Sequence, residues 1–571
     1  MKKCLYSGIL VLFLWSCQTP NPQEQLADLI RRYENFEAYD PKEFPLGDFS
    51  EERFEKEAVF SEQLIDQLQA LPKEELDEDD QISHALLLFE LNEKQAAFEY
   101  KTHWNPILSD DGFHTSLTYT VRPITSRKAA LEYLKLLKSI PRYIEQQKVL
   151  IQKGLEAGMG QPLVIFKGYD ATYEKHILVD SRNHFYYSPF KNLPKTFSNS
   201  FRDSLRTAAL EVIEKDIIPT FKGVKRFFQS EYYPKTRSAI GISKIPNGKA
   251  FYQSRIEYYT TLPLSPEEIH QKGLEEVALI KLRMEEVIKR VGFKGDLSAF
   301  IDYLRTDPQF YAQSAEELLR FTRDVCKKID EQLPRYFITL PRKPYGVAAV
   351  PYALAPKYTG GRYIGTAPDS TDPGYYWVNT FDLPSRPLYV IPSLSAHEAV
   401  PGHHLQGALN AELGATIPKF RKTLYLSAYG EGWGLYSEYL ANEMGIYTTP
   451  YEVFGKLTYE MWRACRLVVD TGIHAFDWTR EEAVNYMKNH TALSLREVNT
   501  EIDRYISWPG QALSYKIGEL KIRELRRKAE NALGTNFDIR QFHEAVLDKG
   551  TLTLPLLEEK INRYINKSLN K

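Results

Sequence analysis

The chain has 571 residues, more than one compact hydrophobic core accommodates, so we expect at least two packed lobes. Its 73 lysines and arginines nearly balance its 75 aspartates and glutamates, and the net charge is −2. This balance excludes a global field that would draw the protein to nucleic acid or to an anionic membrane surface, so we expect neither partner. Composition leaves the oligomeric state open.

The first seventeen residues have the pattern of an export signal. A positively charged start precedes an apolar stretch, residues 9–14, that is too short to span a bilayer as a helix. The segment ends in Leu-Trp-Ser-Cys17, which resembles a bacterial lipobox. We therefore expect residues 1–17 to be a lipoprotein signal peptide. The lipid on Cys17 would be the only membrane anchor, holding the protein to the bacterial cell envelope, at the outer membrane or the periplasmic face. The alternative is an ordinary signal peptide that contains Cys17 by chance.

Most of the remaining chain has the apolar periodicity of amphipathic helices. One helix start is marked by Ser265 as cap, by proline at the first helical position and by Glu268 three residues on. We divide the chain into an N-terminal helical region, 18–230, and a catalytic region, 231–571. The clearest helices are predicted at about residues 24–105, 126–154, 204–218 and 265–291.

Between Pro334 and Pro392 the sequence becomes rich in proline, glycine and tyrosine. The segments Tyr375–Phe381 and Leu388–Ile391 are predicted strands, because aromatic and β-branched side chains fit a pleated surface. The fold class we predict is therefore mainly α, a large multi-helix fold with a small β-sheet inserted before the histidine-rich segment. Such a strand would bind an extended peptide by edge pairing, with Asn379 among the substrate-binding residues. The alternative is a β-rich lobe without a role in binding.

The stretch Ser393–Gln406 follows this region and contains three of the twelve histidines of the chain. A zinc hydrolase needs imidazole ligands and a carboxylate that takes a proton from water, and His397-Glu398 followed by His403 and His404 offers both. In the usual helical motif the two histidines stand four residues apart on one helix face. Here the spacing is longer, so an unbroken helix does not explain it.

The geometry of a regular helix decides which histidines can share an ion. With about 100° and about 1.5 Å per residue, His397 and His403 point to different sides, whereas His397 and His404 align but stand about 10 Å apart. Pro401-Gly402 offers a remedy, because proline removes a backbone donor and glycine tolerates unusual dihedral angles. A bulge there would return His403 to the face of His397. The choice between His403 and His404 stays open, as does a pair of core histidines at a helix kink.

A catalytic zinc ion takes three protein ligands, and Glu431 is the best candidate for the third. It lies within Gly-Glu-Gly-Trp-Gly, where small neighbours let a second helix approach closely. Glu438, seven residues further on, is better suited to orienting one of the histidines. The alternative for both is a carboxylate on an exposed helix surface.

Four segments carry a family resemblance: HEAVPGHHLQ, YGEGWGLYSE, DTGIHAFDW and WPGQALSYKIGELKIREL. Together they resemble the bacterial family catalogued as a domain of unknown function, DUF885, in which many members are lipoproteins. The motifs are also similar to those of helical gluzincin peptidases, including the thermostable carboxypeptidases. The resemblance implies a metallopeptidase-like fold with His397, His403 and Glu431 as ligands, Glu398 as the general base and Tyr515 as a hydrogen-bond donor to the transition state.

Three further residues are candidates for the chemistry. His474 would be a second donor to the oxyanion, and Arg504 and Lys516 would bind a carboxylate of the substrate. Each has a simpler alternative, since His474 can be a buried residue at a helix end and most such cations are solvated. Tyr515 likewise can be an ordinary core tyrosine.

The function predicted from these observations is a zinc-dependent peptidase of the cell envelope, with one Zn²⁺ ion and a peptide substrate. Zinc would activate the water molecule, and Glu398 would accept its proton. Two other functions remain open: a lipoprotein that binds metal or substrate without catalysis, and a metal-dependent hydrolase of other amides or esters.

Overall fold

The computed structural model describes residues 21–178, 180–352, 354–367 and 370–570. The predicted signal peptide and its Cys17 lie outside these residues. The described chain is mainly helical with one small sheet, as predicted. None of its helices combines the length and the apolar character that crossing a bilayer requires.

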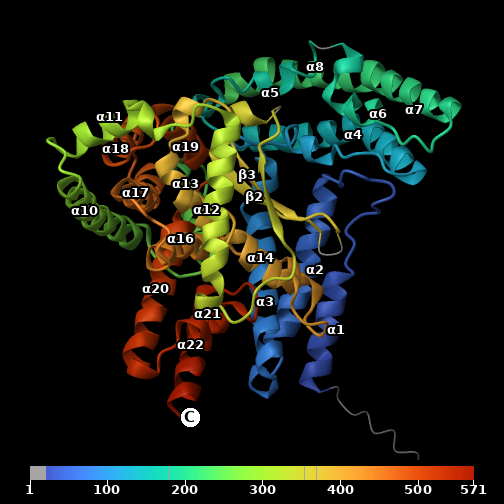
Figure 1. Ribbon diagram of the computed structural model, residues 1–571. Helices are drawn as coiled ribbons and strands as arrows, with labels where there is room; N and C mark the ends of the chain where they lie inside the picture. The colour runs from blue at the N-terminus through green and yellow to red at the C-terminus, as the bar shows by residue number, and fades with distance from the viewer. Residues whose placement is uncertain (1–20, 179, 353, 368–369, 571) are drawn as a thin grey trace, which may run out of the picture.

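The N-terminal helices form two groups (Figure 1). Helices α1 to α3 stand upright side by side, and α4 to α8 form a layer across the top of the molecule. Helix α4 begins close to the predicted start at residue 126, where the Ser126 hydroxyl accepts a hydrogen bond from the backbone N–H of Ala129 at 3.1 Å. The bounds are α1 (Pro22–Glu34), α2 (Glu51–Gln69), α3 (Glu78–Glu99), α4 (Arg127–Glu156), α5 (Ala171–Glu174), α6 (Ser188–Lys191), α7 (Asn199–Val212) and α8 (Ile218–Phe227).

Four helices connect this part to the sheet. The predicted start at Ser265 is confirmed as a capping box with Glu268, in which each side chain accepts a hydrogen bond from the backbone of the other residue. This start fixes where α10 leaves the preceding loop. The bounds are α9 (Gly248–Thr260), α10 (Pro266–Arg290), α11 (Leu297–Thr306) and α12 (Ala315–Tyr336).

The sheet has three strands, β1 (Tyr345–Ala349), β2 (Gly361–Ile364) and β3 (Gly374–Val378), in the order β1-β3-β2. Strand β3 pairs in parallel with β1 and antiparallel with β2, so β2 is an edge strand. The strand predicted from Tyr375 is confirmed, but the one predicted at Leu388–Ile391 is wrong. That segment is a 3₁₀ turn leading into a helix, and a short apolar run bounded by prolines fits a buried helix start as well as a strand.

The C-terminal half is again helical, and its centre is α16, which is buried along most of its length. Helix α16 packs against α20, and α17 packs against α10. The bounds are α13 (Ile391–Glu398), α14 (His403–Ala411), α15 (Lys419–Thr423), α16 (Ser427–Glu443), α17 (Pro450–His474), α18 (Arg480–His490), α19 (Leu495–Ser507), α20 (Ser514–Leu533), α21 (Ile539–Leu547) and α22 (Leu554–Leu569).

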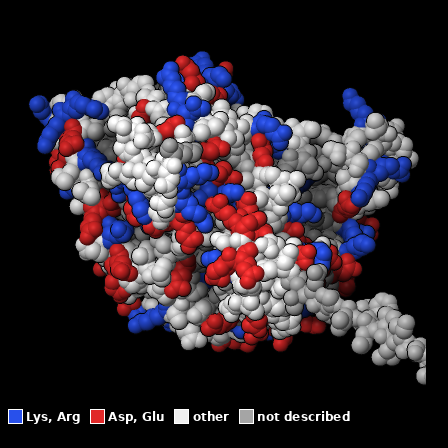
Figure 2. Space-filling view, turned by 90° about the horizontal axis from the view of Figure 1, so that it is seen from below, with Lys and Arg blue, Asp and Glu red and all other residues white. Residues whose placement is uncertain are grey.

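Two apolar clusters form the core. One joins the upper helical layer to α10, α11 and α17, and the other joins α1 to α3 with α16 and α20 to α22. Neither cluster is confined to one side of residue 230, so the predicted boundary there stays a prediction. On the outside, basic and acidic side chains are interspersed over the face seen from below (Figure 2).

Candidate metal centre

The histidine-rich segment is two helices separated by a break at 399–402. Gly402 lies so close to the backbone carbonyl of His397 that a Cβ atom there would collide with it. Pro401 has no N–H to donate, and its carbonyl accepts a hydrogen bond from the indole of Trp433 at 2.7 Å. The predicted interruption of the helix is confirmed. Trp433, from the segment YGEGWGLYSE, holds it in place.

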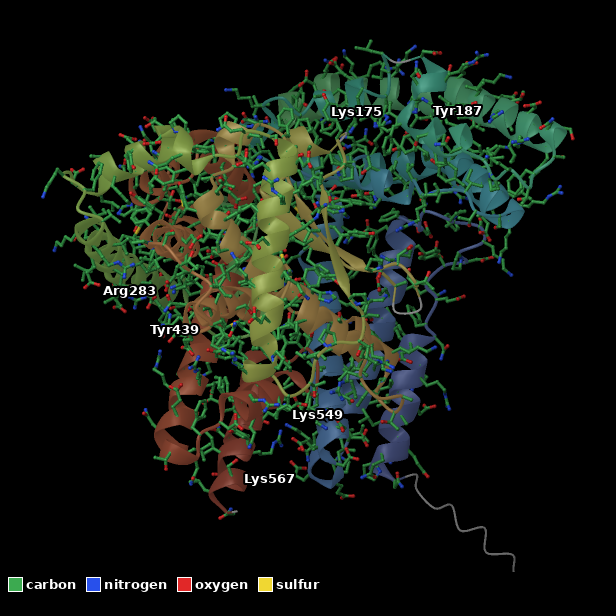
Figure 3. All side chains as sticks on the ribbon, in the orientation of Figure 1. Lys175, Tyr187, Arg283, Tyr439, Lys549 and Lys567 are labelled. Atoms are coloured by element: carbon green, nitrogen blue, oxygen red, sulfur yellow. The ribbon has the colours of Figure 1, made fainter. Side chains whose placement is uncertain are left out.

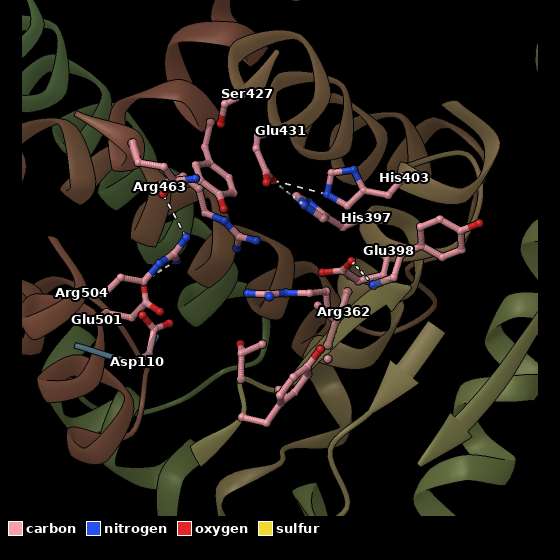
Figure 4. A pocket seen from close by; sticks show the side chains of 18 of the residues that line it. Asp110, Arg362, His397, Glu398, His403, Ser427, Glu431, Arg463, Glu501 and Arg504 are labelled. Atoms are coloured by element: carbon pink, nitrogen blue, oxygen red, sulfur yellow. Dashed lines mark hydrogen bonds and ion pairs between the residues drawn. The ribbon is translucent and has the colours of Figure 1, made fainter. Parts of the chain in front are cut away.

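This break brings His397 and His403 to the same carboxylate. The Nε2 atom of each histidine lies 3.4 Å from Oε2 of Glu431, and the three candidate ligand atoms all lie within 4.8 Å of one another. Ligands about 2.0 to 2.1 Å from a tetrahedral zinc ion are about 3.3 Å apart. The donor types and their spacing therefore fit one zinc ion. Figure 4 shows the three side chains converging at one end of a pocket.

His404 points elsewhere. Its Nδ1 atom lies 3.0 Å from the hydroxyl of Tyr363, and its ring lines a second cavity, away from Glu431. Burial lowers the pKa of His404 to about 4. Successive residues on a helix point about 100° apart, so once α14 starts at His403 only one of the two adjacent histidines can face the cluster.

Glu438 contacts the ligand candidate His397 from behind. Its Oε1 atom lies 2.8 Å from Nδ1 of His397, and its Oε2 atom accepts a hydrogen bond from Ser393 at 2.6 Å. Arg463 lies 3.4 Å from the same carboxylate. A hydrogen bond from Nδ1–H to Glu438 leaves Nε2 free to accept a metal, which is the arrangement that fixes metal-binding histidines in proteins.

The glycines of α16 explain how these parts come so close. A Cβ atom at Gly434 would lie 2.7 to 3.0 Å from three atoms of the His397 ring, so the imidazole rests directly on the backbone of α16. A Cβ atom at Gly432 would lie 2.6 Å from the backbone of Gly518 in α20. The close helix approach predicted from the small residues is thus present.

The electrostatics of the cluster favour positive charge. Burial lowers the pKa of His397, but hydrogen bonds with Glu431 and Glu438 outweigh it and raise the pKa to about 10. Burial raises the pKa of Glu431, but the nearby His403 and His397 outweigh this effect and hold the pKa well below its usual value. Two buried carboxylates around two imidazoles therefore attract a cation, whether protons or a metal ion.

Glu398 ends α13 beside the cluster. One of its carboxylate oxygens, Oε2, accepts a hydrogen bond from the backbone N–H of Tyr363 in strand β2 at 2.8 Å. The residue is 8% exposed and lines the same cavity as the histidines and Glu431. The sheet thus holds one oxygen of the predicted base, and no hydrogen bond within the described chain engages the other.

The cavity has a volume of about 910 Å³. Two of the predicted site residues, Tyr515 and Arg504, line it. The guanidinium of Arg466 lies 4.1 Å from the centre of the Tyr515 ring, and Arg504 donates to the side chain of Gln511 at 3.0 Å. A smaller cavity of about 390 Å³, largely apolar, shares part of the wall, including Leu394.

His474 is not brought to this cavity. Its Nδ1 atom accepts a hydrogen bond from the backbone N–H of Ile242 at 3.1 Å, and its Nε2 atom lies 3.0 Å from the carbonyl of Tyr505. Both ring nitrogens are thus engaged by the backbone of other segments. The placement corrects the prediction and matches its alternative, a buried histidine at a helix end.

Lys516 is also directed elsewhere. It is fully buried and lies 2.9 to 3.1 Å from three carboxylates, those of Glu276, Glu460 and Glu519. Its neighbour Tyr515 faces the cavity, and adjacent positions on a helix point about 100° apart. The predicted contact with substrate is therefore replaced by an ion-pair network in the core.

Asn379 holds a loop together instead of facing the cavity. Its side-chain amide donates hydrogen bonds of 2.9 to 3.1 Å to the carbonyls of Ala355, Tyr358 and Thr359, and its oxygen accepts one from Phe381. The side chain is completely buried. Its effect on the site is indirect, because the loop that it fastens forms part of the cavity wall.

Several residues of the site were missed by sequence reasoning. Trp433 fastens the helix break, Tyr425 donates to Glu431 at 3.1 Å, and Tyr363 contacts both Glu398 and His404. Trp433 stands two residues after Glu431 in the quoted motif, so its position was a signal. The two tyrosines carry no local signal, because their contacts join distant parts of the chain.

Comparisons with known proteins agree on one family. The profile of the family described as "Bacterial protein of unknown function (DUF885)" matches residues 38–561. A crystal structure of a candidate lipoprotein from Colwellia psychrerythraea superposes with a TM-score of 0.86 at 28% identity, covering 96% of this chain and all of that one. A candidate lipoprotein of unknown function from Shewanella oneidensis shares the fold, with a TM-score of 0.67 at 17% identity over 94% of this chain and 96% of that one. No curated protein matches significantly.

Proposed function

The chain belongs to the DUF885 family of bacterial proteins of unknown function, and we propose that it is a zinc-dependent peptidase of the cell envelope. The observation that carries the proposal is the convergence of His397, His403 and Glu431 beside Glu398 in one cavity. The similarity of the motifs to those of gluzincin peptidases supports the same reading.

Zinc is the metal that this donor set suits best. Two imidazole nitrogens and one carboxylate leave a fourth position for water, which distinguishes catalytic from structural zinc sites. His397, His403 and Glu431 would hold the ion. When bound, it supplies a Lewis acid that lowers the pKa of a water molecule and polarises a carbonyl group.

The residues of the chain supply the proton transfers. Glu398 accepts a proton from the attacking water and delivers it to the nitrogen of the leaving amine. Its hydrogen bond with Tyr363 fixes its position while one oxygen stays available. The Tyr515 hydroxyl is the candidate donor to the developing oxyanion, and losing such a donor commonly raises the barrier by about 3 kcal/mol.

Strand β2 favours a peptide over other amides and esters. It is an edge strand, and the N–H of Tyr363 points away from β3 toward Glu398. The backbone groups of Gly361 face the same way, because residues two apart in a strand are equivalent. Gly361 and Tyr363 both line the cavity, so an extended peptide can pair with the backbone of Gly361 and the carbonyl of Tyr363, while the N–H of Tyr363 stays with Glu398.

The location at the envelope rests on the N-terminal pattern. Cys17 follows a signal-like segment, and the Colwellia protein, 28% identical, is described as a candidate lipoprotein. We propose that lipid on Cys17 anchors the protein to a membrane. Replacing Cys17 with serine should release the protein from the membrane fraction, and retention there would argue against the anchor.

The test combines metal analysis with peptide profiling. Purified wild type should contain close to one zinc per chain by mass spectrometry and should cleave members of a peptide library. Glu398→Gln should keep the zinc and lose at least about 100-fold in cleavage rate, because a general base contributes about 10²- to 10⁴-fold. Glu412→Gln is the matched control, since that carboxylate lies just after α14 and bonds to Arg342 outside the cavity.

The other outcomes separate the alternatives. Zinc binding without cleavage of any peptide would refute the peptidase and favour a binding lipoprotein. Cleavage of non-peptide amides or esters alone, in a parallel screen, would identify a different hydrolase. Protein that binds no zinc when His397 and His403 are intact would remove the basis of the proposal.

A further inference from the structure

Arginine side chains dominate one wall of the cavity. We call Arg362, Arg386, Arg463, Arg466 and Arg504 the arginine wall; all five line the cavity that holds the histidine cluster. They come from strand β2, the segment before α13, and helices α17 and α19. In Figure 4, Arg504 lies at the end of the pocket away from His397 and His403.

The carboxylates nearby neutralise only part of this charge. Arg466 and Arg504 share one carboxylate, that of Glu501, at 3.0 and 3.6 Å. Arg463 pairs with Glu438, which is already hydrogen-bonded to His397. Within the described chain, the arginine wall therefore has more cations than carboxylates paired with them.

Arg362 is the clearest case of an unpaired cation. Within the described parts of the chain its side chain makes no hydrogen bond and no ion pair; it is exposed to solvent, and its guanidinium lies 5.6 Å from the centre of the Tyr358 ring. Figure 4 shows its side chain extending into the middle of the pocket, between Glu398 and Arg504. The side chain of Arg386 likewise has no hydrogen-bond or ion-pair partner among the described residues.

Buried guanidinium N–H groups on the wall also lack acceptors. Among the described residues, no group accepts a hydrogen bond from Nε of Arg386, Arg463 or Arg504, or from Nη1 of Arg466, although all four atoms are buried. A buried donor without a partner is costly, and more so when it carries charge. A ligand acceptor that enters this cavity would satisfy such donors.

Other acidic groups on this wall do not reverse its sign. Asp110 and Glu497 line the cavity but form no ion pair with these arginines. Burial raises the pKa of Asp110, and it raises the pKa of Glu497 to about 7 against the opposing effect of Arg386. Glu497 thus carries less negative charge near neutral pH than an exposed glutamate would.

We propose that the substrate carries a carboxylate group, which Arg362 in the middle of the cavity and Arg504 at the end away from the metal centre bind. The inference rests on the proposed peptidase function and specifies its substrate class. A planar guanidinium donates two parallel hydrogen bonds to a carboxylate, so two arginines can satisfy both of its oxygens. The carboxylate belongs either to the C-terminus of the peptide or to an acidic side chain.

The experiment uses four versions of one peptide that the wild type cleaves or, failing cleavage, one that it binds. The C-terminus is free or amidated, and one side chain is Glu or Gln. Binding is measured by calorimetry to zinc-loaded Glu398→Gln, so that hydrolysis does not interfere. At least one carboxylate should tighten binding tenfold or more, and Arg362→Ala in the same background should abolish that difference, with Arg362→Lys intermediate.

Arg496→Ala is the matched control. Arg496 lines the same cavity, but its guanidinium is engaged by the carbonyl of Pro356 at 2.6 Å and by Asp382 at 3.8 Å. Its loss should change the preference for the carboxylate less than twofold. Loss of the preference in both variants alike would refute the specific role of Arg362.

The outcomes keep this inference separate from the proposed function. Dependence on the terminal carboxylate identifies the C-terminus as the group bound, and dependence on Glu identifies the side chain. Equal binding of all four peptides overturns the inference even if peptides are cleaved. A carboxylate preference that requires Arg362 supports it even if no peptide is cleaved, in which case the peptidase proposal fails alone.

Discussion

Two groups of charged side chains flank the start of helix α20 and differ in one respect. The arginine wall faces the cavity with unpaired donors, whereas Lys516 and its partners form a network in which the charges compensate one another. We call Glu276, Lys456, Glu460, Lys516, Glu519 and Arg523 the lysine network. Glu460 alone contacts Lys456, Lys516 and Arg523, and Arg523 lies 2.8 Å from Glu519. Charges that hold helices together are paired with one another, while charges available to a ligand are not.

The outer end of the lysine network reaches the surface (Figure 3). Arg283 of α10 lies 3.4 Å from Glu460, and the guanidinium of Arg523 lies 4.3 Å from the centre of the Tyr439 ring. The network thus joins α10, α16, α17 and α20 from the core outward. Its role is structural, and disturbing it should affect stability first.

The largest expected effect tests that role. Lys516→Met leaves Glu276, Glu460 and Glu519 without their shared cation, and breaking a buried ion pair typically costs about 3 to 5 kcal/mol. We expect the free energy of unfolding in urea, followed by circular dichroism, to fall by about that amount. Lys528→Met in the same helix is the control, because Lys528 is 46% exposed and should cost less than about 1 kcal/mol. Equal stability of the two variants would remove the distinction between the two groups of charges.

The next effect concerns the carboxylate that serves both the metal centre and the arginine wall. Glu438→Gln weakens the acceptor for Nδ1 of His397, and losing such a partner typically costs about 10- to 100-fold in metal affinity. Competition with a chromophoric chelator measures the dissociation constant for zinc. Glu443→Gln, in the same helix but paired with Arg526, should leave the constant unchanged. An unchanged constant in Glu438→Gln would show that Glu438 does not support the metal centre.

Asp470 sharpens the comparison, because it is a buried carboxyl held by hydrogen bonds and by no ion pair within the described residues. Burial raises its pKa from 3.8 to about 7, against hydrogen bonds from Tyr252 and the backbone of Gly510. The folded pKa lies above the unfolded value, so the folded protein keeps a proton that the unfolded chain loses as the pH rises from about 4 to 7. This contribution to stability is fully present below about pH 4 and is lost as the pH rises through 7, by at most about 1.4 kcal/mol per pH unit.

The corresponding variant is Asp470→Asn, which keeps an oxygen acceptor and removes the titration. Relative to the wild type, we expect its melting temperature to rise progressively from pH 4 to pH 8. Thermal unfolding at several pH values measures the difference. A constant difference across that range would contradict the raised pKa.

The smallest expected effect concerns the neighbouring histidine. His404→Ala should change zinc content less than twofold, because His404 faces Tyr363 and not Glu431, whereas His403→Ala should lose most of the zinc. Mass spectrometry of the dialysed proteins makes the comparison. The reverse result would mean that His404, and not His403, faces Glu431.

Local signals in the sequence predicted the parts of the fold that depend on neighbouring residues. The helix starts at Ser126 and Ser265, the break at Pro401-Gly402 and the close approach at Gly432 follow from caps, a missing N–H and absent side chains. Each of these signals acts over a few residues. Local signals therefore sufficed for the main helices and for the helix break beside the candidate metal centre.

Positions that depend on how distant segments meet were not predictable in this way. Tyr515 and Lys516 are adjacent, yet one lines the cavity and the other joins the core network. His474 and Asn379 were predicted to bind substrate or the transition state, but their side chains form hydrogen bonds with backbone groups of other segments. A polar residue in a motif does not reveal whether its partner will be a ligand or the protein itself.

Helix α16 contacts both histidines of the candidate metal centre and the helix break between them. Glu431 contacts both histidines, and Trp433 donates a hydrogen bond to the carbonyl of Pro401 in the break. The ring of His397 packs on Gly434, and its Nδ1 atom lies beside Glu438. The two histidines belong to different helices, so no single backbone ladder fixes their separation. A chain of this fold can therefore change the number of residues between its two histidines, but inserting one residue between 431 and 438 would put all of these contacts out of phase at once. The relative positions of the site residues are therefore set by α16, although this helix contributes only one of the three candidate ligands.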